Sequence, residues 1–208
     1  SHGRSNREVR IFATPLDRQE IAELEGLRLT TPVRTVIDTA RVSPLEWGVA
    51  IADAALHERL ATREQLLRAA ASASGRSGVS KALRAVEFAD PLAQSPLESI
   101  SRLQIARAGL PRPELQRPIF LEGRKVATTD FAWPEFGVVG ECDGMSKYAQ
   151  LLDPGDTPDQ AIMREKRREE LIRQAGWWIV RWDFALAMRP HLLAARLRDA
   201  FEFGRPRS

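Results

Sequence analysis

The chain has 208 residues, of which 43% are hydrophobic and 28% are charged, a composition typical of a soluble globular protein. No apolar run is long enough to span a bilayer, and a lone cysteine, Cys142, excludes an intramolecular disulfide and argues against a cysteine-based zinc site. The net charge of +3 is small, so a polyanionic partner has to be argued from where the arginines cluster. We therefore expect a soluble, cytoplasmic protein without a membrane partner.

Residues 4–90 are predicted to form an α-helical N-terminal region, after an opening Ser-His-Gly that is typical of a cleaved tag. Short helices rich in Ala, Leu and Arg are expected from Pro15 to about Phe88. Their starts carry capping residues, with a proline in the first turn or a Glu or Gln three residues after the cap. These starts are Thr31-Pro32, Ser43-Pro44-Leu45-Glu46 and Thr62-Arg63-Glu64-Gln65.

The sequence pattern changes at residue 91, and residues 91–208 are predicted to form an α/β domain with the element order α-β-β-β-α-β-α. A helix starts at Ser95 and stops at Gly109, and glycine- or proline-containing breaks then separate the strands. The remaining predicted elements are strands at 114–120, 125–133 and 138–143, a helix at 159–175, a strand at 177–182 and a helix at 191–203. The first three strands should pair as an antiparallel meander within a mixed sheet flanked by helices.

Three carboxylates are the first candidate site. Residues two apart on a strand share a face, so Glu141 and Asp143 should lie side by side, about 7 Å apart at their α-carbons. The meander should bring Asp130 close to them. Clustered carboxylates repel one another unless they are protonated, hydrogen-bonded or bridged by a cation, and Mg²⁺ or Mn²⁺ is the simplest bridge.

The alternative is that Glu141 and Asp143 end a strand and pair with lysines or arginines in a surface network. Gly140 and Gly144 favour the site, because a residue without a side chain beside each carboxylate lets a substrate backbone approach. A bulge or turn would select glycine equally well.

These residues resemble the core of PD-(D/E)XK nucleases. The segments SPLESISRLQIARAGLPRP, DFAWPEFGVVGECDGMSKY and EKRREELIRQAGWWIVRW are similar to the very-short-patch-repair-like endonuclease domain of many actinobacterial proteins. The resemblance implies a restriction-endonuclease-like fold and metal-dependent hydrolysis of DNA. It implies metal ligands at Asp130, Glu141 and Asp143 and catalytic roles for Lys147 and Glu98.

The match departs from the family at one position, because Asp143 stands where the usual motif has lysine. Lys147, or Lys166 on the following helix, would then have to supply the positively charged side chain that the usual motif lysine provides. Glu98 also has two interpretations. It lies three residues after Ser95 and so completes a capping box, while the resemblance makes it an outer metal ligand.

The helix expected at 159–175 carries the candidate nucleic-acid contacts. A projection at 100° per residue turns Glu165 and Arg168 toward the sheet, either as an internal ion pair or with Arg168 binding a phosphate or holding Glu141. The outward basic residues could follow a phosphate backbone, although a solvated helix face is a common meaning of such runs. They are Arg164, Lys166, Arg167 and Arg173.

Two classes of function remain open from the sequence, and cleavage of tRNA or other RNA by the same chemistry is a third possibility. One is a metal-dependent DNA endonuclease in DNA repair or phage defence. The other is a catalytically inactive nuclease fold that binds DNA or a partner in a regulator or antitoxin, because the N-terminal half, notably TTPVRTVIDTAR, resembles the helical segment of abortive-infection-type antitoxins. A homodimer, or an upstream winged helix absent from this chain, is compatible with either.

Overall fold

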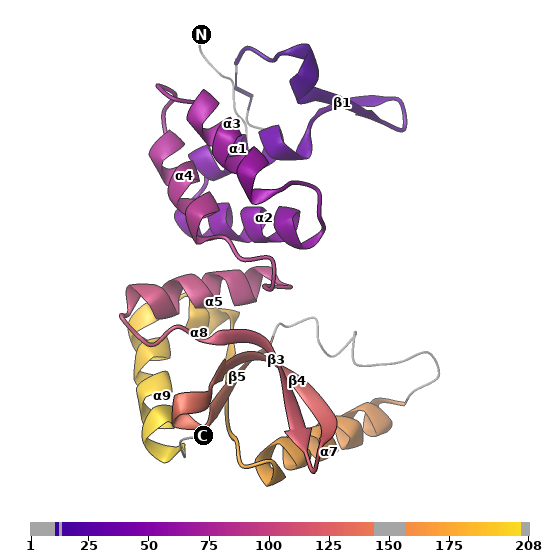
Figure 1. The fold of residues 1–208 in the computed structure, drawn as a ribbon, viewed down its shortest axis with the longest axis vertical. Coiled ribbons are helices and arrows are strands. Elements are labelled where there is room, and N and C mark those ends of the chain that lie inside the picture. The colour runs from indigo at the N-terminus through magenta and orange to yellow at the C-terminus, as the bar shows by residue number, and fades with distance from the viewer. Residues whose placement is uncertain (1–10, 13, 144–156, 205–208) are drawn as a thin grey trace.

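The computed structural model describes residues 11–12, 14–143 and 157–204. Figure 1 shows a group of N-terminal helices at the top, the helix α5 (Pro96–Arg107) in the middle, and a sheet flanked by helices below. Among the described residues, no helix combines the length and apolarity that a membrane span requires.

The N-terminal region begins with a β-hairpin that the sequence prediction missed. A 3₁₀ turn at Arg18–Glu20 leads into β1 (Ile21–Leu24), which pairs antiparallel with β2 (Leu27–Thr30). The connection is Glu25-Gly26, and both residues have positive φ, 51° and 79°. Two consecutive positive φ values are typical of the two-residue turns that join twisted strands, so local turn chemistry overrode the helical expectation here.

Four helices follow the hairpin and pack around one core. They are α1 (Pro32–Val42), α2 (Leu45–His57), α3 (Arg63–Ser72) and α4 (Val79–Phe88). The core contains buried Val36, Ile37, Val49, Leu66 and Val86 together with many alanines.

The predicted caps hold at two of the three helix starts. The side chain of Thr31 accepts a hydrogen bond from the backbone of Arg34, and Thr62 forms a capping box with Gln65. The expected box at Ser43 is wrong. The Ser43 N–H donates to the carbonyl of Thr39 at the end of α1, and α2 starts two residues later with Pro44 at its N-cap and no side-chain cap. A two-residue connection leaves Ser43 to serve the first helix only.

Helix α5 is buried on nearly every side because it belongs to two cores. Leu103 packs with the N-terminal helices, while Leu97, Ile100 and Ile105 pack against the sheet. Its Arg102 is 5% exposed and places Nη2 at 3.0 and 2.9 Å from the two carboxylate oxygens of Asp53 on α2, which is 1% exposed. The other terminal nitrogen donates to the carbonyl of Phe88 at 2.7 Å. One arginine therefore joins α5, α2 and the end of α4.

The sheet has four strands in the order β3-β4-β5-β6. The strands are β3 (Glu114–Leu121), β4 (Arg124–Trp133), β5 (Val138–Asp143) and β6 (Trp178–Asp183). The pairs β3–β4 and β4–β5 are antiparallel, as the meander predicted, and β6 is parallel to β5. A 3₁₀ turn at Pro134–Phe136 joins β4 to β5.

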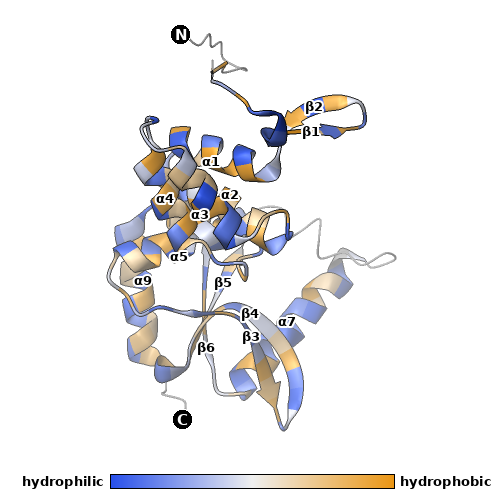
Figure 2. Cartoon of the chain, turned by 45° about the horizontal axis from the view of Figure 1, so that its top comes forward, coloured by the Kyte–Doolittle hydropathy of each residue, from blue (hydrophilic) through white to orange (hydrophobic). Residues whose placement is uncertain are grey.

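Helices cover both faces of this sheet. The helix α7 (Pro158–Gln174), which lies in the chain between β5 and β6, packs on one face against Ala132, Val139 and Trp177. The helices α5, α8 (Phe184–Ala187) and α9 (Pro190–Phe203) cover the other face. Figures 1 and 2 both show α7 and α9 on opposite sides of the sheet, and Figure 2 shows hydrophilic residues along much of α7.

The glycine that precedes the candidate acids has a packing role. A Cβ placed on Gly140 would lie 2.5 Å from the indole of Trp182 and 3.2 Å from that of Trp133. Both tryptophans are buried against α5 and α9, on the face opposite α7. Within the described structure, Gly140 makes room for indole rings, and the sequence interpretation that it admits a substrate backbone is not supported by what surrounds it. Gly144 lies outside the described residues.

The buried pair between α5 and α2 yields a stability prediction. Asp53→Ala should lower the free energy of unfolding by about 3–5 kcal/mol, because Arg102 would remain buried without its counter-charge. Chemical denaturation measures this loss. In Glu64→Ala, which breaks the exposed Arg68–Glu64 pair, the change should stay within about 0.5 kcal/mol. Equal effects in the two variants would contradict a structural role for the buried pair.

A second prediction concerns Gly140. Gly140→Ala should destabilise the protein by about 1–3 kcal/mol, because the added methyl group would overlap the indole of the buried Trp182. Near-UV circular dichroism should change as well, since the indole of Trp182 has to shift. Unchanged stability and spectrum would show that the packing around Gly140 is looser than this geometry.

Candidate functional site

Asp130 and Glu141 lie next to each other on adjacent strands. The antiparallel pairing of β4 with β5 places Phe131 opposite Gly140, so Asp130 and Glu141 continue the same ladder. The backbone N–H of Cys142 donates to Oδ2 of Asp130 at 2.8 Å. Cys142 itself is buried among the residues under α5 and α9, as its alternation with Glu141 predicted. The two acids therefore share the face that α7 covers.

Both carboxylate oxygens of Glu141 are bound by arginines. Glu141 is 3% exposed; Arg168 of α7 donates to its Oε1, and Nε of Arg181 on β6 donates to its Oε2 at 3.0 Å. Burial raises the pKa of Glu141, but the hydrogen bonds and charges of Arg168 and Arg181 outweigh burial, so this pKa lies below its usual value. Glu141 is thus ionised and neutralised inside the protein.

Two further glutamates of α7 hold the same arginines. Glu165 binds Nη1 of Arg168 at 3.1 Å and Nη2 of Arg181 at 2.6 Å, and Glu169 binds Nη1 of Arg181 at 2.9 Å. These four residues are 29–30% exposed, so solvent reaches the outer part of the cluster. We call Glu141, Arg168, Arg181, Glu165 and Glu169 the arginine–glutamate network. It ties β5, β6 and α7 together.

The charge of Asp130 also acts on Arg168 of this network. Burial lowers the pKa of Arg168, yet its hydrogen bond to Glu141 and the charges of Glu141, Glu165 and Asp130 raise it above its usual value. Asp130 is half-buried at this position. Together with Asp130, the network therefore places four carboxylates and two guanidinium groups at the α7 face of the sheet.

The donor set is compatible with a divalent cation, although arginines already bind part of it. Mg²⁺ is commonly held by one or two carboxylates together with waters and phosphate oxygens, a number that Asp130 and Glu141 supply. Within 11–12, 14–143 and 157–204, no group of three His, Cys, Asp or Glu side chains is arranged around a common metal position. Since one arginine binds each oxygen of Glu141, a cation at this carboxylate has to share its oxygens with positively charged guanidinium groups or displace them.

Two predicted site residues are only partly covered by the structure. Asp143 is the last residue of β5 and its backbone pairs with Asp183 of β6, but its side chain is not among the described atoms. Lys147 lies outside the described residues. The predicted roles of Asp143 as a metal ligand and of Lys147 as the catalytic cation stay predictions.

Glu98 shows only part of the predicted capping box. The hydroxyl of Ser95 accepts from the backbone N–H of Glu98 at 3.2 Å and donates to its Oε1 at 2.8 Å. The other carboxylate oxygen, Oε2, accepts from the backbone N–H of Gln94 at 3.0 Å, where a capping box would use the N–H of Ser95, and from the side-chain amide of Gln116 at 2.9 Å. Gln116 has φ 49° and stands between the paired residues Leu115 and Arg117, at the level of Asp130. Ser95 is therefore confirmed as the N-cap, the reciprocal bond of the box is shifted to Gln94, and the role of Glu98 as an outer metal ligand stays a prediction.

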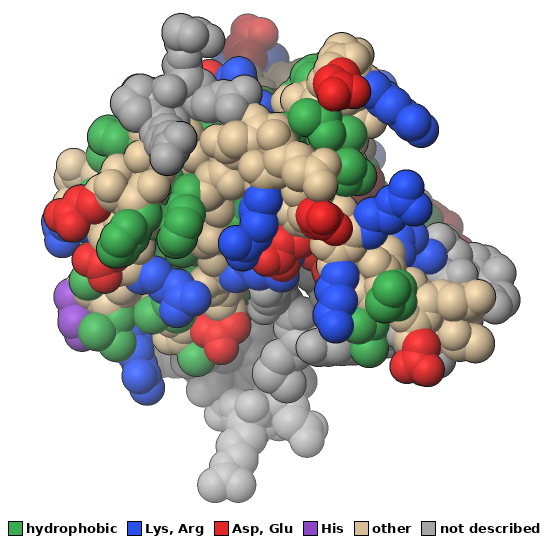
Figure 3. All heavy atoms as spheres, turned by 90° about the horizontal axis from the view of Figure 1, so that it is seen from below, with side chains coloured by type: hydrophobic (Ala, Val, Ile, Leu, Met, Phe, Trp, Pro, Cys, Tyr) green, Lys and Arg blue, Asp and Glu red, His purple; other side chains and the backbone are tan. Residues whose placement is uncertain are grey.

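The predicted nucleic-acid contacts divide into two groups. Arg164, Lys166 and Arg167 are exposed on α7, and Arg173 is exposed while its guanidinium pairs with Glu169. Arg168 faces the sheet, as the helical projection indicated. On the face seen from below in Figure 3, Lys and Arg side chains are interspersed with acidic and hydrophobic ones. Positive charge on this face is therefore local to short stretches of surface.

Alternation with the tryptophans of its strand predicts that Arg181 emerges beside the site or pairs with an acid, and the structure pairs it with Glu141. The signal that places it there is its register: in the parallel pairing of β5 with β6, Arg181 is the partner of Glu141. Alternation with buried Val180 and Trp182 shows only that Arg181 points to the other face. Which acid it meets depends on a strand pairing that spans 40 residues of chain.

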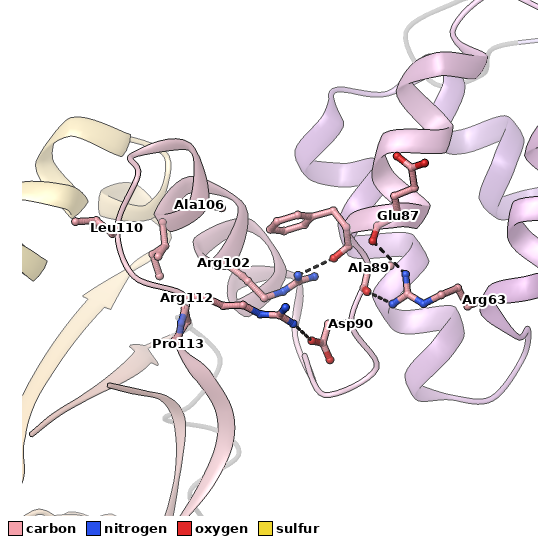
Figure 4. Close-up of a pocket in the computed structure, with 11 residues that line it drawn as sticks. Arg63, Glu87, Ala89, Asp90, Arg102, Ala106, Leu110, Arg112 and Pro113 are labelled. Atoms are coloured by element: carbon pink, nitrogen blue, oxygen red, sulfur yellow. Dashed lines mark hydrogen bonds and ion pairs between the residues drawn. The ribbon is translucent and has the colours of Figure 1, made fainter. Parts of the chain in front are cut away.

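A separate pocket of about 330 Å³ lies where the two parts of the chain meet, and its arginines already have partners (Figure 4). Arg63 donates to the carbonyls of Val86, Glu87 and Ala89, and Arg112 lies 3.4 Å from a carboxylate oxygen of Asp90. Arg63 thereby adds a donor to backbone carbonyls at the C-terminal end of α4, where the carbonyl of Val86 also accepts from the N–H of Ala89. The pocket has a structural explanation.

Comparison with known proteins gives one distant similarity. The chain is 32% identical over 160 residues to uncharacterised proteins of Mycobacterium tuberculosis, named Rv2248 in strain ATCC 25618 / H37Rv and MT2308 in strain CDC 1551 / Oshkosh. The match covers 77% of this chain and 56% of each relative, so the chain spans little more than half the length of the curated relatives it matches. No family model and no solved structure matches the chain.

The network yields a prediction for the metal-free protein. Glu141→Gln should lower the free energy of unfolding by roughly 1–3 kcal/mol, because two guanidinium groups lose an anionic acceptor and solvent compensates only in part. Thermal denaturation in the presence of EDTA measures this. Glu170→Gln, on the exposed side of α7, is the matched control and should leave the melting temperature unchanged. A Glu141→Gln variant as stable as wild type would show that the network contributes no net stability.

Proposed function

We propose that this chain carries a PD-(D/E)XK-type nuclease domain that binds DNA and hydrolyses phosphodiester bonds with Mg²⁺ or Mn²⁺. The observation that carries the proposal is the adjacency of Asp130 and Glu141 on one face of the sheet, where β5 ends. Two carboxylates from neighbouring strands at this position are what the resemblance to very-short-patch-repair-like endonucleases requires.

The order of elements supports the same proposal. A helix, α5, precedes a three-stranded antiparallel meander, and α7 then leads into a strand parallel to the third one. This is the α-β-β-β-α-β arrangement that the family resemblance implies for residues 91–208. A fold alone does not establish an activity, so the acids carry more weight than the topology.

In the proposed reaction, Asp130, Glu141 and Asp143 hold the cation. A bound Mg²⁺ supplies charge stabilisation at the phosphate and lowers the pKa of a bound water. Lys147 is the proposed cation that orients water or stabilises negative charge on the phosphate in the transition state. Arg164, Lys166 and Arg167 provide exposed positive charge for the phosphate backbone.

A second function is favoured by one specific observation. Both oxygens of Glu141 are bound to guanidinium groups, and Asp143 stands where the nuclease motif has lysine. A domain whose carboxylate is neutralised by arginines can keep its fold without a metal. The alternative is therefore a non-catalytic module that binds DNA or a partner in a regulator or antitoxin.

Cleavage of a nucleic-acid panel decides between the two functions. Purified protein with Mg²⁺ or Mn²⁺ is incubated with plasmid, mismatched, branched and single-stranded DNA and with structured RNA. We expect cleavage by wild type, loss of cleavage without loss of binding in Asp130→Asn and Glu141→Gln, and slower turnover in Lys147→Ala, whose effect should fall mainly on the transition state. Binding without cleavage of any substrate would select the non-catalytic module.

Binding itself has a charge-matched test. The double variant Lys166→Gln/Arg167→Gln should weaken DNA binding and reduce the slope of log affinity against log salt by about 1–2, because a protein that neutralises fewer phosphates releases fewer counterions on binding. The control is Arg196→Gln/Arg198→Gln on the exposed face of α9, which removes the same charge from the opposite side of the sheet. Equal weakening in both variants would mean that binding follows net charge alone.

A further inference from the structure

Arg168 and Arg181 bring two positive charges to the carboxylate that the proposed divalent cation would bind. Each guanidinium comes from a different element, α7 or β6, and each takes a different oxygen of Glu141. A buried carboxylate has to be compensated, and here arginines provide the compensation. A divalent cation and these guanidinium groups therefore seek the same oxygens, and like charges this close repel.

We propose that Arg168 and Arg181 are an internal counter-cation that competes with a divalent metal for Glu141, and that metal binding frees their N–H groups to bind a nucleic-acid phosphate. This rests on the proposed function and names a device within the same site. Both arginines are positioning residues for Glu141 in the metal-free state. They become phosphate contacts once Glu141 has changed partner.

The arginines can leave Glu141 and still have solvent and other hydrogen-bond acceptors. Arg168 and Arg181 are 30% and 29% exposed, whereas Glu141 is 3% exposed, so solvent reaches the guanidinium groups. Each also has acceptors that remain in place: Glu165 binds both, and Glu169 binds Arg181. These α7 glutamates keep both guanidinium groups at the edge of the site. An arginine released there presents a planar fork of donors that matches a phosphate group.

The device makes two ligands cooperative. Metal binding frees phosphate donors, and phosphate binding draws the arginines from Glu141 and so opens the metal position. By linkage each ligand must then increase the affinity for the other by the same factor, typically about 5- to 150-fold. A purely structural role for the arginines predicts no such coupling. It also predicts that removing either arginine weakens metal binding, because Glu141 loses its orientation.

The first experiment measures Mn²⁺ affinity by electron paramagnetic resonance in the full chain without nucleic acid. Arg181→Gln and Arg168→Gln should each bind Mn²⁺ more tightly than wild type, by about fivefold or more, because a competing charge is gone. Arg196→Gln is the control: Arg196 is exposed on α9, on the side of the sheet opposite α7, so the Mn²⁺ affinity of this variant should match wild type. The two single variants are independent, so a folding failure in one leaves the other to decide.

The second experiment measures affinity for a duplex containing non-hydrolysable phosphorothioate linkages, with EDTA or with Ca²⁺. In wild type and Arg196→Gln, Ca²⁺ should raise duplex affinity about fivefold or more. In Arg168→Gln and Arg181→Gln this enhancement should shrink toward one, although metal binding has become tighter. An arginine with a merely structural role would not tighten metal binding and weaken the coupling between metal and duplex when it is removed.

The outcomes separate this inference from the proposed function. Unchanged or weaker Mn²⁺ binding in both arginine variants overturns the inference, even if wild type cleaves DNA; so does an absence of Mn²⁺ binding in every variant. Tighter binding in the variants together with diminished coupling supports it, even if wild type cleaves no member of the substrate panel, and in that case only the proposed hydrolysis fails. Tighter binding with intact coupling overturns the release step.

Discussion

Glu141 is a nearly fully buried carboxylate, and the need to neutralise it inside the protein organises the C-terminal domain. Its two oxygens meet guanidinium groups that come from α7 and from β6. Two glutamates of α7 then hold the same arginines from the outer side. Position of the helix, pairing of the last strand and charge of the site are thus consequences of one buried anion and its partners.

The same arrangement bears on the choice between enzyme and binding module. A carboxylate whose charge is compensated by arginines needs no metal for the domain to stay folded, which suits a non-catalytic module. The same compensation keeps Glu141 ionised and in a fixed position, which suits an enzyme that binds a divalent cation at this carboxylate. The adjacent Asp130 is compatible with both, because its carboxylate accepts from the backbone N–H of Cys142 and would also be a second oxygen ligand in the proposed metal site.

Helix α5 explains why the helical region and the sheet domain are structurally connected. Its residues are buried from Leu97 to Ile105, and they contribute to both cores. The same helix starts at the N-cap Ser95, whose hydroxyl binds Glu98, and Glu98 in turn accepts from Gln116 on β3. Arg102 joins α5 to α2 and to the end of α4. A displacement of the N-terminal helices would therefore also displace α5, which packs on one face of the sheet. The two parts therefore share a helix as well as a chain connection.

Local sequence patterns were sufficient to predict most of the C-terminal elements. Alternating residues and glycine or proline breaks located the strands within one or two residues, and the third matches at both ends, Val138–Asp143. They failed in the N-terminal region, where the hairpin β1–β2 is too short for a clear period and its turn, Glu25-Gly26, was not recognised. They also misplaced one helix start, because Ser43 ends the preceding helix instead.

By itself, then, the sequence determined which residues form most elements of the sheet domain, that Glu141 and Cys142 face opposite sides, and that Arg168 turns inward, because these properties follow from periods of two and 3.6 residues along one segment. It did not predict the short helix α8, whose four residues are too few to show a period. Only the tertiary structure decided which groups meet. Arg168 and Arg181 are 27 and 40 residues from Glu141, and Gly140 is required by Trp182 on another strand. Such contacts depend on how a crossover helix and a parallel strand pack together, and no local period encodes that distance.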